Sequence, residues 1–199
     1  MNMLPILALV AVQQPTFEQY MHGWWIITGD RNFVTFALRS SIQGPPSARR
    51  LAGRTIASQA QSGLLETRFT VEIDCLKRRS RYINLTGYGA TGTQAVPLPK
   101  PSQNFRPITP KSNGEYLASF ACETNAQGDP PVGYLTMLPT REVADQTFRF
   151  IGLGLDRDAA AALAAIDARR APKAFNDLLQ VLVTAARQPY VRAIKIPEK

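Results

Sequence analysis

The chain has 199 residues, enough for one domain with an appendage or for two small domains. Hydrophobic residues make up 45% of it, and 23 Lys and Arg against 15 Asp and Glu give a net charge of +8. Such a charge favours anionic partners, although it also simply keeps proteins in solution. One histidine and two cysteines nearly exclude a zinc site built on Cys and His, and we predict neither a metal nor a cofactor.

The N-terminus contains an uncharged apolar run from Leu4 to Val12, which has the length of a signal-peptide core. The run is too short to span a bilayer, which needs about 20 residues. We therefore predict an export signal over residues 1–12, and the alternative is a strand of the core. No other segment predicts a transmembrane helix. The expected location is the periplasm, the cell surface or the medium.

Four stretches predict strands of a small antiparallel sheet. Residues 33–39 are rich in β-branched and aromatic side chains, and residues 47–58 form a second candidate. Residues 68–75 (RFTVEIDC) alternate apolar and polar side chains with a period of two, which indicates a half-buried strand. After a polar break at residues 77–80, the alternation resumes over residues 81–88, and this short gap predicts a hairpin.

A capping-box pattern predicts one short helix. Ser112-Asn113-Gly114-Glu115 fits S-x-x-E, and apolar residues follow at helical spacing. We predict a helix from about Ser112 to Cys122. Residues 125–133 (NAQGDPPVG) then predict a linker.

Residues 134–199 predict a helical extension. It contains an apolar stretch over residues 148–155 and a helix that begins at Asp156 or Asp158. A second helix follows Pro172, and its apolar side chains form one stripe. We expect a helical hairpin packed on the sheet, and the alternative is an amphipathic helix that binds a partner or a membrane.

Gly87-Tyr88-Gly89-Ala90-Thr91-Gly92 fits the G-x-G-x-x-G pattern of dinucleotide-binding loops. That loop needs a helix to begin at the glycines, because the helix N-terminus holds the pyrophosphate. Here Pro97 and Pro99 follow closely, and the preceding strand belongs to a predicted hairpin. We interpret the glycines as a turn or a bulge.

Groups suited to catalysis are sparse. His22 is the only histidine, and no G-x-S-x-G motif is present. Glu72 and Asp74 share one strand face, and we interpret them as solvent-side charges beside Arg68. The sequence therefore predicts a protein without enzymatic activity, and a carboxylate-centred hydrolase is the alternative.

Basic residues gather on one candidate strand and around the hairpin turn. We predict that they form a contact surface for a protein or for an anionic envelope or matrix component, centred on residues 77–81. A nucleic-acid platform of cations and the rings of Tyr82 and Tyr88 is less favoured, and charge that protects a sheet edge is the other interpretation. The candidate residues are Arg49, Arg50, Arg54, Lys77, Arg78, Arg79 and Arg81.

The two cysteines end two predicted elements. Cys75 ends a strand on its apolar face, and Cys122 ends the short helix. A bridge between them would clamp the helix to the sheet and stabilise the fold by about 4 kcal/mol, from the entropy of the closed loop. The alternative is two buried thiols, but the candidate export signal favours the disulfide.

The order of these features is distinctive. An early Trp is followed by a strand ending in Ser-Ile, a basic strand, the strand that ends at Cys75, an Arg-rich hairpin, a glycine-containing return strand, and residues 108–115 (ITPKSNGE) leading to Cys122. Over about residues 24–123 this resembles the surface-adhesin protein E-like domain of bacterial envelope proteins. The resemblance implies a small sheet with a helix tied on by a Cys75–Cys122 disulfide, export, and binding to extracellular-matrix components of a host.

Together these features predict an α+β fold: a small antiparallel sheet with one disulfide-tethered helix, plus a C-terminal helical hairpin. We divide the chain into a signal peptide (1–12), a surface-adhesin E-like β-rich domain (18–124), a linker (125–133) and a helical extension (134–199). The predicted function is that of an exported, non-enzymatic binding protein of the bacterial envelope. The alternatives are a cytosolic or periplasmic binder of nucleic acid or another anionic ligand through the basic hairpin, and a hydrolase.

Overall fold

The computed structural model describes residues 23–61, 63–89, 95–96, 98–124, 130–136, 138–166 and 172–187. The predicted export signal, His22 and residues 125–129 of the predicted linker lie outside these ranges. Within them, no helix is both long enough and apolar enough to cross a membrane.

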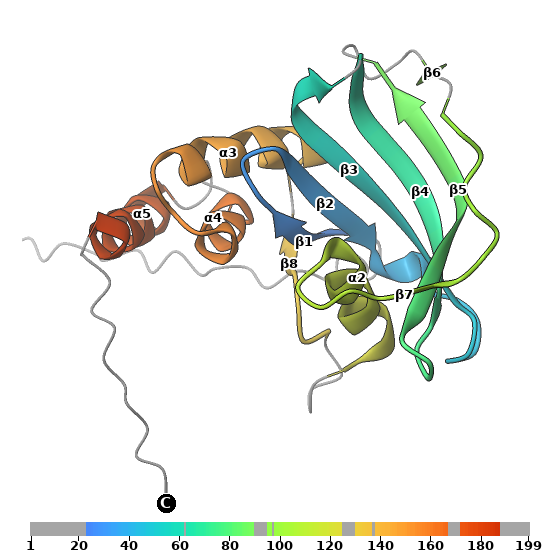
Figure 1. Ribbon diagram of the computed structural model, residues 1–199. Helices are drawn as coiled ribbons and strands as arrows, with labels where there is room; N and C mark the ends of the chain where they lie inside the picture. Colours follow the sequence, from blue (N-terminus) through green and yellow to red (C-terminus); the bar gives the residue numbers. More distant parts are fainter. Residues whose placement is uncertain are drawn as a thin grey trace, which may run out of the picture.

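The described strands form one antiparallel sheet in the order β6-β5-β4-β3-β2-β1-β8, with β7 paired separately to β5 (Figure 1). The α+β class with an antiparallel sheet is therefore confirmed. The strands are β1 (Trp24–Gly29), β2 (Phe33–Leu38), β3 (Arg49–Gln61), β4 (Leu64–Asp74), β5 (Arg79–Tyr88), β6 (Ala95–Val96), β7 (Arg106–Pro107) and β8 (Tyr134–Thr136). A 3-10 turn, Arg39–Ser41, follows β2.

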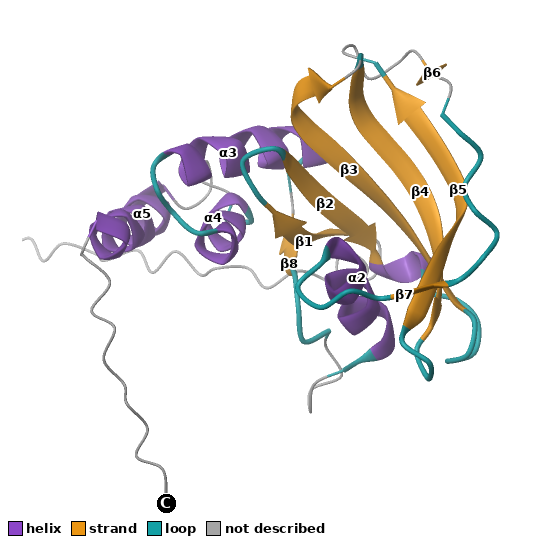
Figure 2. Ribbon diagram, in the orientation of Figure 1, coloured by secondary structure: helices purple, strands orange, loops and turns teal. Residues whose placement is uncertain are grey.

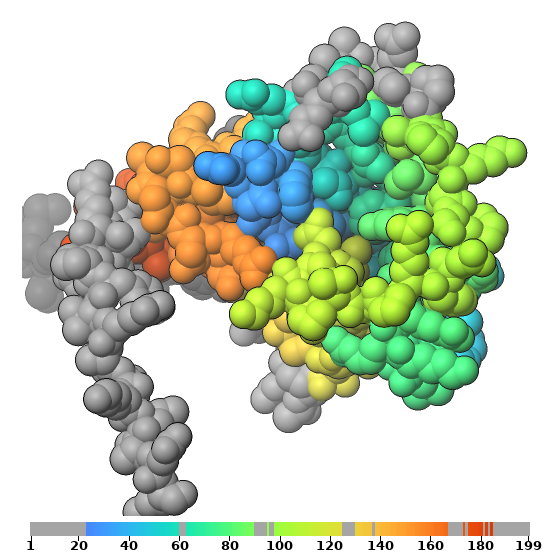
Figure 3. Space-filling model, viewed as in Figure 1, coloured from blue at the N-terminus to red at the C-terminus, as the bar shows by residue number. Residues whose placement is uncertain are grey.

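Helices cover both faces of the sheet (Figure 2). The described helices are α2 (Asn113–Cys122), α3 (Thr140–Gly152), α4 (Arg157–Ala164) and α5 (Pro172–Arg187). α2 contacts β1 and β3 on one face, and α3 and α4 contact β1, β2, β3 and β8 on the other. Figure 3 shows the α2 side, where the yellow-green segment that contains α2 lies next to the blue β1–β2 region.

Each face of the sheet has its own hydrophobic core, because alternate residues of a strand point to opposite faces. The core under α2 contains Trp25, Ile27, Ala37, Leu51, Phe69, Val71 and Ile73 from the strands and Leu117, Ala118, Phe120 and Ala121 from the helix. The core under α3 and α4 contains Ile26, Val34, Phe36 and Ile56 from β1, β2 and β3. β4 and β5 contribute no buried residue to this second core, so their side facing away from α2 stays polar.

The predicted hairpin and capped helix are confirmed, with small shifts at their ends. β4 and β5 pair antiparallel, but the turn between them occupies residues 75–78 instead of 77–80. α2 begins after its N-cap Ser112, whose Oγ accepts a hydrogen bond from the Glu115 amide at 3.3 Å. The Glu115 carboxylate accepts from the Lys111 amide instead of returning to the N-cap residue.

The C-terminal segment differs from the predicted helical hairpin. α4 begins after the N-cap Asp156, as predicted, and α5 begins at Pro172, which suits the first turn of a helix. α3 was not predicted, because its polar N-terminal half masked a helix that includes the apolar residues Phe148, Phe150 and Ile151. The described part of the segment thus holds three helices, and its first element, β8, is a strand that pairs with β1.

Candidate binding surface

The register of β3, β4 and β5 brings nine charged or aromatic side chains to the face of the sheet that lies opposite α2. Arg50, Glu72 and Arg81 are neighbours across the three strands, as are Arg54, Arg68 and Thr86. Residues directly opposite one another in neighbouring strands project to the same side. We call this surface the arginine face; it consists of Arg50, Arg54, Glu66, Arg68, Glu72, Asp74, Arg79, Arg81 and Tyr88.

Carboxylates lie at the bottom of the arginine face and guanidinium groups on top. The side chains of its three acids, Glu66, Glu72 and Asp74, are 4–13% exposed. The side chains of its five arginines are 20–61% exposed. A partner approaching this face therefore meets an excess of positive charge. The expectation that Glu72 and Asp74 are solvent-side charges was wrong, because both residues are buried beneath arginines of the neighbouring strands β3 and β5.

Glu72 is bound by two arginines from the strands on either side. Its Oε2 accepts from Arg50 Nε at 3.0 Å, and its Oε1 accepts from Arg81 Nη2 at 2.7 Å. Next to this group, Arg79 Nε donates to Asp74 Oδ2 at 2.9 Å. The three strands thus contribute one linked ionic cluster at the end of the sheet near the β4–β5 turn.

The electrostatics of this cluster hold both acids in their ionised form. Burial alone would raise the pKa of Glu72, but the hydrogen bonds and charges of Arg50 and Arg81 outweigh it and lower that pKa. The pKa of Asp74 is lowered in the same way, since the amide of Lys77 and the guanidinium of Arg79 outweigh its desolvation. Neither carboxyl group has the raised pKa of a general acid.

A second ionic cluster lies further along β4. Glu66 Oε1 accepts from Arg68 Nε at 2.7 Å, and Arg54 Nε is 3.6 Å from the same oxygen. Arg54 also donates from Nη1 to Thr140 Oγ1 at the start of α3, at 2.6 Å. This bond connects the arginine face to the helical layer beside it.

Aromatic rings support four of the arginines. The Arg54 guanidinium lies 4.6 Å from the centre of the Trp24 ring, and Arg68 lies 4.3 Å from that of Tyr88. Arg79 and Arg81 lie 4.8 and 4.6 Å from the ring of Phe105, in the segment that crosses the edge of β5. Such cation–π contacts fix the orientation of otherwise flexible side chains.

The predicted basic residues do not form one surface. Arg50, Arg54, Arg79 and Arg81 come together on the arginine face. Arg49 points to the other face, where its Nη1 donates to the carbonyl of Ala121 at 2.9 Å.

Two further candidates lie on the β4–β5 turn. Arg78 pairs with Glu115, in the first turn of α2, and with Glu123, the C-cap of that helix, at 3.1 and 3.3 Å. Lys77 is exposed, and its amide donates to Asp74. Part of the predicted centre of the contact surface, residues 77–81, therefore holds α2 on the sheet.

Five residues of the arginine face were not among the predicted site residues. Arg68, Glu72 and Asp74 lie on one face of the alternating stretch, so the period of two placed them together without showing what they contact. Glu66 precedes the predicted start of the strand, and Tyr88 joins the face only through its pairing with Glu66. Strand register, which no local pattern specifies, was the missing information.

The predicted disulfide is confirmed. Cys75 and Cys122 are bonded, with their Cα atoms 5.8 Å apart, and they join the end of β4 to the last residue of α2. Among the described residues, no group of three or more His, Cys, Asp or Glu side chains lies close enough to hold a metal ion.

The glycine-rich stretch includes the end of a strand. Gly87 lies in β5, between Thr67 of β4 and Val96 of β6, both antiparallel to it. A Cβ atom on Gly87 would press on the side chain of Leu64 and lie 3.1 Å from that of Leu98, so the close approach of these neighbours favours glycine. Residues 90–94 lie outside the described ranges.

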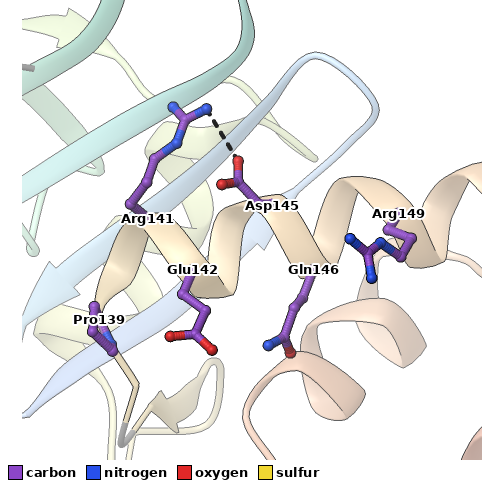
Figure 4. A pocket seen from close by; sticks show the side chains of 6 residues that line it. All are labelled: Pro139, Arg141, Glu142, Asp145, Gln146 and Arg149. Carbon is purple, nitrogen blue, oxygen red and sulfur yellow. Dashed lines mark ion pairs between the residues drawn. The ribbon is translucent and has the colours of Figure 1, made fainter. Parts of the chain in front are cut away.

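A shallow hollow of about 540 Å³ lies along the outer side of α3 (Figure 4). Two arginines and two acids line it, and Arg141 pairs with Asp145 at 3.0 Å, so its charges balance. It shares no residue with the arginine face. The lining residues are Pro139, Arg141, Glu142, Asp145, Gln146 and Arg149.

Comparison of the chain with models of protein families, with curated proteins and with solved structures finds no match. The function must therefore be inferred from the arrangement of this chain's own residues.

Proposed function

We propose that this chain is an exported, non-enzymatic binding protein that holds an anionic partner against the arginine face. The observation that carries the proposal is the layering of that face, where buried carboxylates lie beneath exposed guanidinium groups. The acids fix the arginines in place, and the arginines outnumber them. The surface therefore combines positive charge with order, which lowers the entropic cost of binding.

The bonding of individual arginines supports this role. Arg50 and Arg79 each bond their carboxylate through Nε. In the part of the chain that the structure describes, the terminal nitrogens of these two arginines have no hydrogen-bond partner. Arg68 bonds Glu66 through Nε and also interacts with the side chain of Tyr88. Guanidinium groups bind sulfate, phosphate and carboxylate oxygens through such N–H donors.

Export is supported by the disulfide and by the apolar N-terminal run. Disulfides form and persist outside the reducing cytosol, and Cys75 and Cys122 are bonded. The intact mass of the protein from its native cells tests this part of the proposal. We expect loss of about the first dozen residues, which include the apolar run from Leu4 to Val12, and two thiols that become alkylated only after reduction. A full-length mass with both thiols free would overturn export.

Binding is tested with two arginine variants of equal charge and equal exposure. Arg68 on the arginine face and Arg141 on α3 each pair with one acid, and each side chain is 45% exposed. The probe is dextran sulfate, with neutral dextran as the blank. We expect R68Q to bind dextran sulfate about tenfold more weakly than the parent protein, the loss of one charge-assisted contact, and R141Q to bind as the parent does.

The matched pair separates a specific surface from bulk charge. If R68Q and R141Q lose affinity equally, the net charge of +8 attracts the polymer without a site, and the proposal fails. The denaturation midpoints of both variants show whether either has lost its fold.

A further inference from the structure

We infer that the partner is a linear polysaccharide bearing sulfate or phosphate ester groups, and that it lies along β4 and contacts both ends of the arginine face. Two ionic clusters occur on this face, one around Glu66 and one around Glu72. Glu72 follows Glu66 by six positions along β4, and at about 3.3 Å per residue the two acids, and the clusters around them, are roughly 20 Å apart.

The surface between the two ionic clusters is uncharged. Ala52, Thr70 and Asn84 stand directly opposite one another on β3, β4 and β5, on the side of the arginine face. All three are small or medium-sized, so a chain can pass from one cluster to the other without meeting a bulky side chain. Along β4, the arginine face thus presents one cationic cluster, an uncharged stretch and a second cationic cluster.

This spacing favours an extended partner over a small anion. One sulfate or phosphate group can contact only one cluster, because the other lies about 20 Å away. A chain with repeated anionic groups contacts both, and its second contact is intramolecular, which raises the overall affinity without a new kind of bond.

The aromatic rings favour a polysaccharide over a nucleic acid. Proteins that bind single strands stack bases on ring faces. The rings of Trp24, Tyr88 and Phe105 are each covered by an arginine of this face at 4.3 to 4.8 Å. The rings serve to position cations, and a partner recognised by its charges alone fits this arrangement.

The distribution of apolar side chains disfavours a lipid surface. The large hydrophobic side chains exposed in the described part of the chain are Leu76, Tyr82, Tyr134 and Leu153. None belongs to the arginine face: Leu76 lies in the β4–β5 turn, and Tyr82 pairs with Val71 toward the α2 side. A membrane-bound surface combines cations with apolar groups that insert between lipids.

Because this assignment rests on the proposed function, the experiment varies the length and the chemistry of the probe independently. The affinity of the full chain is measured for a sulfated disaccharide and for long dextran sulfate, each expressed per sulfate group. We expect the long chain to bind at least 100-fold more tightly, as for other bivalent contacts. Phosphomannan serves as the phosphate-bearing arm and shows which ester is preferred.

Variants at the two ends test the bridging contact. Arg50 belongs to the cluster at Glu72, and Arg68 belongs to the cluster at Glu66. In R50Q, and separately in R68Q, we expect the advantage of the long chain to fall about tenfold or more, while R141Q keeps it. R50Q leaves Glu72 bound to Arg81, so the fold should persist, and denaturation midpoints check this.

Each remaining outcome decides between explanations. A long chain that binds no better per sulfate than the disaccharide overturns the bridging inference and leaves the proposed function standing. Tighter binding of single-stranded DNA of equal charge, or of anionic phospholipid vesicles, assigns the face to that partner instead. If no anionic probe distinguishes R68Q from R141Q, the proposed function itself fails.

Discussion

Arg49 donates a hydrogen bond from Nη1 to the backbone carbonyl of Ala121 at 2.9 Å, which ties β3 to the last turn of α2. Its neighbour Arg50 bonds Glu72 on the opposite side of the sheet. Adjacent residues of a strand point to opposite faces, so two arginines that look alike in the sequence have different roles. Arg49 helps to hold the fold, and Arg50 belongs to the arginine face.

The substitution R49Q should lower the free energy of unfolding by about 1–2 kcal/mol, because the Ala121 carbonyl loses a charge-assisted donor. It should leave binding to dextran sulfate unchanged. R50Q is the matched control and should show the reverse pattern, with weaker binding and a smaller loss of stability. Chemical denaturation and polymer binding of both proteins check this, and an equal loss of binding in the two variants would contradict it.

Removal of the disulfide should destabilise the protein strongly. Cys75 and Cys122 are 47 residues apart in the chain, and a closed loop of this size is worth about 4 kcal/mol in the entropy of the unfolded state. The double substitution C75S with C122S should therefore move the midpoint of denaturation far to lower denaturant. The wild-type protein in a reducing buffer should match it, and an unchanged midpoint in both would show that the bond carries little stability.

Acid should destabilise the fold through Glu72 and Asp74. The folded state lowers the pKa of each carboxyl group, so their contribution is fully present above the ordinary pKa of the unfolded chain. That contribution is lost as the pH falls below about 5 and both groups become protonated. Thermal unfolding followed from pH 7 to pH 3 should show this fall.

The variant E72Q should flatten part of this acid dependence, because it removes one of the two titrating groups. D145N removes an exposed acid on α3 and is the control. A parent protein whose stability rises on acidification would reverse the expected sign and contradict the ion-pair account.

Gly53 is a position where a single methyl group should be costly. A Cβ atom there would press on the Phe69 ring and come within 2.8 Å of the Phe36 carbonyl oxygen. We expect G53A to lose about 1–3 kcal/mol of stability, the usual cost of overpacking. G152A at the end of α3 is the control, since a Cβ atom there meets nothing within 4 Å, and calorimetry should show little change for it.

Local signals specified several elements from the sequence. The period of two over residues 68–75 predicted a strand, and the pattern S-x-x-E predicted α2 with Ser112 as its cap. The pairing of Cys75 with Cys122 also followed, because each cysteine ends one of those elements and the chain has no others. Such features depend on interactions within a few residues or on a single pair, so a sequence can show them.

The tertiary structure decided how the strands are placed next to one another. β1 and β8 lie side by side although about a hundred residues separate them, a distance over which no periodicity extends. The same holds for the arginine face, where Arg50, Glu72 and Arg81 meet only because three strands adopt one register. The sequence by itself determined which residues alternate and where a helix begins. Register and long-range pairing, set by packing over the whole sheet, decided which charges meet.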